Sequence, residues 1–139
     1  AEGEAVRVLA HLDSPSYRPY QVLQLVVELT VQPGYHVYST PIPDGYVALT
    51  IEVEPIEGLI AGDASWPEPH PFRVQGLDDD FWVLEGVVRG GVPVSLTKAD
   101  AGDQVIKATV RFQACSDTLC LRPATVHVEL PVRLAEAVA

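Results

Sequence analysis

Cys115 and Cys120 are the two residues of this chain whose type and spacing best suit chemistry. They are its only cysteines, and four residues lie between them. A disulfide between them closes a small ring, so on the chain-entropy model it stabilises the fold by only about 2 kcal/mol. Because alternating segments flank the pair, we expect it on an accessible connection between strands, where exchange with another protein's thiols is possible. The pair is therefore predicted to be redox-active.

Two other uses of the cysteine pair stay open. A local disulfide can be purely structural, in an exported immunoglobulin-like binding or assembly module. Two thiolates also suit Cu(I), which would make this a copper-handling domain. Zinc fits less well, since it takes four ligands and the four histidines are scattered at positions 11, 36, 70 and 127. The redox interpretation requires no metal and no cofactor, and the sequence carries no phosphate-cradling Gly-rich loop.

The elements that must position the cysteines follow from an alternation of apolar and polar residues with period two. It is strongest over 23–31, 106–112 and 126–132, and weaker over 6–12, 35–39, 47–53, 81–89 and 92–96. Side chains at i and i+2 share one face of a strand, so each segment offers an apolar face and a wetter face. About eight short strands with frequent Pro and Gly turns predict an all-β fold, an immunoglobulin-like antiparallel β-sandwich.

Composition and charge narrow the class of protein. The 139 residues, 47% of them hydrophobic, are enough for one domain with a sizeable core, and we take 1–139 as a single domain. A net charge of −10 argues against a nucleic-acid partner and against binding to an anionic membrane surface. No apolar run approaches the roughly 20 residues of a membrane helix. Because the sequence contains no Met, we expect a processed exported protein or an excised domain.

Three segments resemble one known family. Residues 112–123, FQACSDTLCLRP, resemble the active-site hairpin of the amino-terminal domain of the DsbD family of transmembrane thiol:disulfide interchange proteins. Residues 33–39, PGYHVYS, resemble its early Gly-aromatic strand, and residues 65–72, SWPEPHPF, its Trp-Pro segment ahead of the loop that covers the active site. The three matches follow the family's order and span most of the chain. The chain departs from the family at Arg122-Pro123, where many members have Pro-Pro, and in having four residues between the cysteines where some have five.

The resemblance implies an immunoglobulin-like domain on the periplasmic side of the membrane that carries out thiol:disulfide interchange. Such a domain accepts two electrons from a thioredoxin-like domain and reduces periplasmic disulfide oxidoreductases. The second cysteine of the family's pair forms the mixed disulfides, which gives that role to Cys120 and the resolving role to Cys115. The chain itself is not expected to span a membrane, although the resemblance is compatible with tethering to a transmembrane domain.

Charged residues beside the cysteines are candidates for tuning them. Arg122 lies two residues after Cys120 and would favour a thiolate there, whereas Asp117 lies two residues after Cys115 and would disfavour one. Ordinary solvated charge explains both residues at least as well.

Aromatic residues in and beside the long loop 65–80 form a second candidate group. In the family, a cap loop that bears an aromatic residue shields the disulfide from wrong partners. Phe72, Phe81 and Trp82 are the candidates for that part in this chain. Trp66, by contrast, is expected to pack in the core.

The segment 33–39 contributes two tyrosines and a histidine. Tyr35 and Tyr38 differ by three positions, so they face opposite sides of a strand, and one of them is expected to reach the cysteines. His36 and His127 occupy the polar positions of alternating segments and are expected at the surface rather than as ligands.

Overall fold

The fold is built from β-strands. The structure, a computed structural model, describes residues 5–73, 80–98 and 102–135. Within those ranges there are twelve strands and no helix, which confirms the all-β prediction while correcting the expected number of about eight strands. The strands are β1 (Val6–Leu12), β2 (Ser16–Tyr17), β3 (Val22–Val31), β4 (His36–Ser39), β5 (Thr50–Val53), β6 (Leu59–Ala61), β7 (His70–Arg73), β8 (Asp80–Leu84), β9 (Val87–Leu96), β10 (Gln104–Phe112), β11 (Ala114–Cys115) and β12 (Ala124–Leu134).

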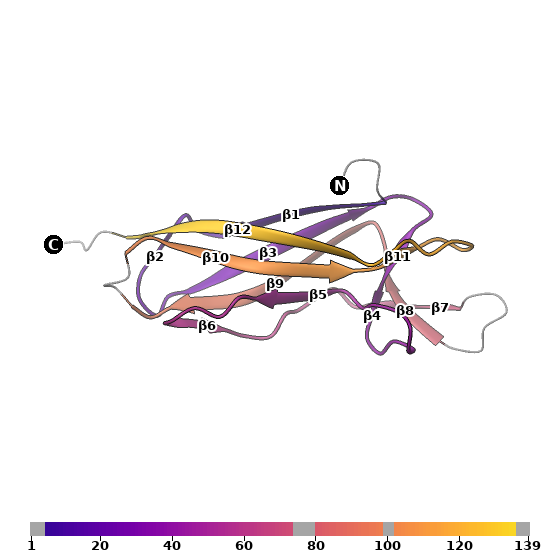
Figure 1. The fold of residues 1–139 in the computed structure, drawn as a ribbon, viewed down its shortest axis with the longest axis horizontal. Helices are drawn as coiled ribbons and strands as arrows, with labels where there is room; N and C mark the ends of the chain where they lie inside the picture. The colour runs from indigo at the N-terminus through magenta and orange to yellow at the C-terminus, as the bar shows by residue number, and fades with distance from the viewer. Residues whose placement is uncertain (1–4, 74–79, 99–101, 136–139) are drawn as a thin grey trace.

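Two four-stranded sheets form the body of the molecule (Figure 1). The strand order is β1-β3-β9-β6 in one sheet and β2-β12-β10-β5 in the other. Their strands pair in antiparallel fashion except for a short parallel pairing of β2 with β12. Side chains from both sheets join in one hydrophobic cluster, as the immunoglobulin-like prediction requires. We call this cluster the main core.

The period-two pattern explains why these strands form where they do. On β3, Leu25, Val27 and Leu29 are inaccessible to solvent, and the residues between them are only partly buried. On β10, Ile106 and Val110 are buried in the same way, and the alternate positions are wetter. Burial of the apolar face of each strand against the opposite sheet supplies the hydrophobic stabilisation of the sandwich.

A third sheet, with the order β11-β4-β8-β7, lies at one end of the sandwich (Figure 1). One face of this sheet contributes Val37 and Leu84, which lie opposite each other on β4 and β8, to the main core. The other face carries a separate small cluster. Its buried members are Tyr38, Phe81, Val83 and Cys115, with Ile42, Tyr46 and Phe72 packed against them. We call this group the end cluster, and the sheet separates it from the main core.

Four strands lie outside the eight expected segments: β2, β6, β7 and β11. The strands expected over 81–89 and 92–96 are instead β8 and β9, because the break between them falls at Gly86, whose φ of +69° strand residues do not adopt. The segment expected as a long loop over 65–80 contains β7, which pairs with β8. Residues 74–79 of that segment lie outside the described residues.

A close approach between Trp66 and Gly90 anchors the chain just before β7. Trp66 packs against the main core, as expected. A Cβ atom at Gly90 would lie 2.1 Å from Cε3 of the Trp66 ring, so only a glycine permits this contact. Two backbone hydrogen bonds between Ser65 and Gly91, of 2.9 and 3.0 Å, hold the same segment on β9. This anchor fixes the start of the hairpin that carries Phe72 over the end cluster.

Candidate redox site

Cys115 and Cys120 form a disulfide within a short hairpin that begins at β11. Their Cα atoms are 4.0 Å apart, and the two residues form an antiparallel bridge. The amide of Ser116 donates to the carbonyl of Leu119 at 2.7 Å, and the amide of Leu121 donates to the carbonyl of Ala114 at 2.9 Å. The Ser116 hydroxyl also accepts from the amide of Leu119 at 3.1 Å. Backbone hydrogen bonds therefore close this hairpin independently of the disulfide.

The two cysteines differ strongly in accessibility. Cys115 is only 1% exposed and belongs to the end cluster, whereas Cys120 is an exposed residue. Exchange begins when a thiolate reaches one sulfur of a disulfide, so access decides which sulfur is attacked. In this hairpin Cys120 is the residue that another protein can reach, and Cys115 lies beneath it.

Tyr38 is the tyrosine that reaches the disulfide. Its hydroxyl lies 3.8 Å from Sγ of Cys120, and its side chain is buried in the end cluster. Burial, with a smaller contribution from Tyr46, raises the pKa of Tyr38 to about 12. The hydroxyl thus keeps its proton at neutral pH and can donate to a sulfur anion. Tyr35 lies on the other face of the segment and packs against the main core.

His36 is buried, which makes the expectation of a surface position wrong. It is 2% exposed, and it lies directly opposite Cys115 in the pairing of β4 with β11. Burial lowers the pKa of His36, although Glu85 and Asp117 act in the opposite direction. His127, in contrast, is exposed on β12 as expected, with its Nδ1 3.2 Å from the Thr109 hydroxyl.

Of the three cap candidates, Phe72 has the contacts that a cover requires. Its ring centroid lies 4.3 Å from that of His36, and it packs against the cluster that contains Cys115. Phe81, opposite Phe72 in the pairing of β7 with β8, is fully buried inside the same cluster. Trp82 occupies the alternate position on β8 and therefore faces away from the cluster.

Gln113 holds the hairpin in place, and the sequence interpretation missed it. It is 8% exposed, its Nε2 donates to the carbonyl of Leu121 at 3.2 Å, and its Oε1 accepts from the amide of Val47 at 3.1 Å. Its side chain thus ties the hairpin to the segment that leads into β5. One feature of the sequence could have indicated it: Gln113 is a single polar amide residue between Phe112 and Ala114, at the point where the alternation of apolar and polar residues ends.

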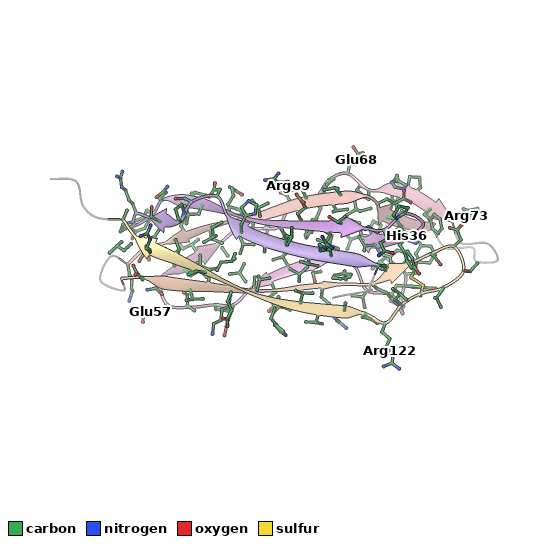
Figure 2. The ribbon with its side chains drawn as sticks, turned by 90° about the horizontal axis from the view of Figure 1, so that it is seen from above. His36, Glu57, Glu68, Arg73, Arg89 and Arg122 are labelled. Carbon is green, nitrogen blue, oxygen red and sulfur yellow. A yellow bond between two sulfur atoms is a disulfide. The ribbon has the colours of Figure 1, made fainter. Side chains whose placement is uncertain are left out.

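The two charged candidates, Asp117 and Arg122, are exposed on the hairpin. Figure 2 shows Arg122 projecting outwards from the end of the molecule that contains His36. A groove of about 460 Å³ is lined by Leu121 and Arg122, which follow Cys120 in the chain, and by residues of the main core. Among the described residues, no three His, Cys, Asp or Glu side chains are grouped to hold a metal ion.

Residues 9–131 match the family described as thiol:disulfide interchange protein DsbD, N-terminal. This chain belongs to that family. The DsbD N-terminal match covers both cysteines, β4 and the β7–β8 hairpin, so it agrees with the resemblance seen in the three sequence segments. The chain is thus a domain of the thiol:disulfide interchange class, and it carries a disulfide between its two cysteines. Comparison with curated proteins finds none that matches.

Solved structures of DsbD-like domains share the fold. The N-terminal domain of Neisseria meningitidis DsbD in the reduced form superposes with a TM-score of 0.61 at 13% identity, covering 93% of this chain and 86% of that one. The N-terminal periplasmic domain of ScsB from Proteus mirabilis gives a TM-score of 0.53 at 21% identity, covering 92% of this chain and 45% of that one. Among the described residues of this DsbD N-terminal domain, there is no helix long and apolar enough to cross a membrane.

The disulfide is expected to contribute little to the stability of this domain. The variant Cys115→Ser with Cys120→Ser should stay folded and lose about 2 kcal/mol or less, because the bridge spans a sequence separation of 5 and closes a small ring. The hairpin keeps its backbone hydrogen bonds and its tie to Gln113. Urea unfolding followed by circular dichroism measures the loss, with the reduced unaltered protein as control. A double variant already unfolded at 25 °C would show that the disulfide is a structural staple.

Proposed function

We propose that this chain is a single extracytoplasmic exchange domain that carries two electrons through Cys115 and Cys120. It accepts electrons from a thioredoxin-like domain or protein and reduces partner disulfide oxidoreductases. The observation that carries the proposal is the unequal burial of the two cysteines within one hairpin, because an exposed cysteine backed by a buried one suits stepwise exchange, in which access decides which sulfur is attacked. Family membership supports the same chemistry.

The proposed reaction has two steps. The Cys120 thiolate attacks one sulfur of the partner's disulfide, so that a mixed disulfide forms and the partner's other sulfur leaves as a thiolate. The Cys115 thiolate then attacks Sγ of Cys120, the mixed disulfide breaks, and the partner's second thiolate leaves. Two dithiol protons and two electrons pass to the partner, which is reduced, while this domain is oxidised to the disulfide. Reduction by a thioredoxin-like donor follows the same steps in reverse.

Charged and polar neighbours support Cys120 as the sulfur that exchanges. The protonated hydroxyl of Tyr38, 3.8 Å from Sγ of Cys120, can donate to the anion when this sulfur attacks or leaves. Arg122 adds a positive charge to the exposed side of the hairpin. The groove lined by Leu121 and Arg122 offers a partner a surface to contact, and Phe72 covers the buried side.

We assign the domain to the periplasm, or the equivalent extracytoplasmic compartment. The N-terminal domain of ScsB to which the chain is similar is periplasmic, and a disulfide is stable in such an oxidising compartment. The proposed partners are proteins with thioredoxin-like sites. A net charge of −10 makes a nucleic-acid partner unfavourable.

The reduction potential of the cysteine pair tests the proposal. Equilibration with glutathione mixtures, followed by mass spectrometry of alkylated thiols, should give a value above about −300 mV, because structural disulfides lie below that limit. The unaltered protein unfolded in guanidinium serves as the reference for an unconstrained pair. A value well below −300 mV would support the alternative of a binding module with a structural disulfide. Tight Cu(I) binding by the reduced protein, together with no exchange, would support the copper-handling alternative.

A further inference from the structure

The buried histidine beside the end cluster, His36, has no part in the exchange steps described above. His36 and Cys115 lie directly opposite each other on the antiparallel strands β4 and β11. Opposite residues of such a pair project from the same face, with Cβ atoms about 5 Å apart. The two side chains therefore share the face of the sheet that carries the end cluster, and Figure 2 shows His36 within that end of the molecule.

His36 carries an unsatisfied nitrogen in this apolar setting. Of the buried side-chain nitrogen and oxygen atoms in residues 5–73, 80–98 and 102–135, Nε2 of His36 is the one without a hydrogen-bond partner. The Phe72 ring, 4.3 Å away, and the Tyr38 ring, 5.3 Å away, flank the imidazole. A buried polar atom without a partner destabilises a fold by roughly 1–3 kcal/mol, so its presence calls for an explanation.

Resolution of the mixed disulfide creates a need that such a nitrogen can meet. Cys115 must lose its proton before it can attack, because the thiolate is the nucleophile. Cys115 is 1% exposed, and burial in apolar surroundings raises the pKa of a thiol. Water is therefore a poor base at this sulfur. An imidazole beside a thiol is a common way of activating a cysteine in proteins.

We propose that His36 accepts the proton of the Cys115 thiol and thereby activates Cys115 to resolve the mixed disulfide. This inference rests on the function proposed above. The proton moves from Sγ of Cys115 to Nε2 of His36, and the Cys115 thiolate attacks Sγ of Cys120. The bond between Cys120 and the partner breaks, and the departing partner thiolate takes up a proton, either from the imidazolium or from water. No external oxidant or reductant is needed, since the partner disulfide supplies the oxidising equivalents.

The surroundings of His36 suit this role electrostatically. Burial, the largest influence, lowers the pKa of His36 in the disulfide form, and His70 acts in the same direction, whereas Glu85 and Asp117 favour the imidazolium. The imidazole is thus neutral and able to accept a proton at neutral pH. The two sulfurs then have separate partners: the Tyr38 hydroxyl serves Cys120, and the His36 imidazole serves Cys115.

Ring closure after attack by oxidised glutathione tests the inference without a protein partner. Reduced protein is mixed with oxidised glutathione, samples are quenched in acid, and mass spectrometry follows the glutathionylated intermediate as Cys115 closes the ring. His36→Gln should close at least about tenfold more slowly than the unaltered protein at pH 7, the lower range of a general-base contribution. The difference should shrink between about pH 9 and 10, where hydroxide deprotonates the thiol directly. His127→Gln, which changes an exposed histidine, is the matched control and should close at the unaltered rate.

The outcomes separate the inference from the function on which it rests. Equal closure rates and pH profiles for His36→Gln and the unaltered protein would overturn the role of His36, while closure itself would still support exchange. Failure of the unaltered protein to form or resolve the glutathione adduct would instead contradict the proposed function. A slower rate at every pH, with no recovery above pH 9, would indicate a structural effect and also overturn the inference.

A second measurement needs no substitution at His36 and applies even if His36→Gln does not fold. Nuclear magnetic resonance titration of the unaltered protein follows the ring resonances of His36 in the oxidised and the reduced forms. Because burial raises the pKa of the Cys115 thiol, the imidazole of the reduced form titrates first, and loss of the thiol proton beside it should give a second step at alkaline pH. That second step should be absent from the oxidised form and from Cys115→Ser, and it should persist in Cys120→Ser. A reduced form without the second step would contradict the proposal.

Discussion

The reduced Cys115→Ser variant should trap a thioredoxin-like partner as a mixed disulfide, and Cys120→Ser should trap at least about tenfold less. Cys115→Ser keeps the exposed sulfur and removes the sulfur that would release the partner. Cys120→Ser keeps only the thiol of Cys115, a residue that is 1% exposed. Because exchange requires direct access to sulfur, burial alone predicts a large difference. Both single variants should also lose catalytic turnover, since each lacks half of the dithiol.

The measurement uses a thioredoxin whose second active-site cysteine is replaced by serine and whose first is activated as a thionitrobenzoate disulfide. Release of the coloured thiolate gives the rate, and mass spectrometry counts the covalent complexes. Both variants unfolded in guanidinium should react at similar rates, which controls for thiol content. Equal trapping by the two folded variants would remove the assignment of roles to Cys120 and Cys115. Absence of trapping by both would count against exchange with this partner.

Phe72→Ala should open the site to the wrong thiols. The ring of Phe72 packs over the end cluster and contacts His36, so its removal uncovers the side of the disulfide that is otherwise buried. We expect reduction of the disulfide by free glutathione to become roughly tenfold faster, because access of the thiol controls the rate. The free energy of unfolding should fall by about 2 kcal/mol, less than for a fully buried phenylalanine.

Trp82→Ala is the matched control for this prediction. It removes an aromatic ring from the same hairpin. Trp82 lies between Phe81 and Val83 on β8, so its side chain projects from the face of the sheet opposite to the end cluster. Its rate of reduction by glutathione should therefore stay within about twofold of the unaltered rate. Rates are measured by alkylation of the released thiols at fixed times. If Trp82→Ala accelerates reduction as much as Phe72→Ala does, then loosening of the hairpin and not loss of the Phe72 cover is the cause.

The sequence predicted the sandwich because its strands follow a local rule. Alternation over 23–31 and 106–112 reports which side chains face the opposite sheet, and that is settled by neighbours within the same strand. The cysteine pair was equally visible, since two cysteines at short spacing already limit the possible chemistry. The break at Gly86 was not visible, because nothing in 81–89 besides one glycine marks the end of a strand.

His36 could not be placed from the same rule. In the segment 33–39 it occupies the position that alternates with apolar Val37, which local reasoning assigns to solvent. The structure covers that face with a second layer, in which Phe72 arrives from β7, thirty-six positions further along the chain. Gln113 was missed for a similar reason, because its partner Val47 comes from a distant segment. Contacts between layers depend on topology, and alternation within one strand carries no information about them.

The sheet β11-β4-β8-β7 has the consequence that reactivity and folding can be altered by separate sets of residues. Val37 and Leu84 face the main core, while Tyr38 and Val83, their immediate neighbours, face the end cluster. Substitutions on the outer face change what surrounds the sulfurs without leaving a cavity in the sandwich. An engineer could therefore graft a different cover or a different pair of proton-handling side chains onto this face and leave the scaffold beneath it unchanged.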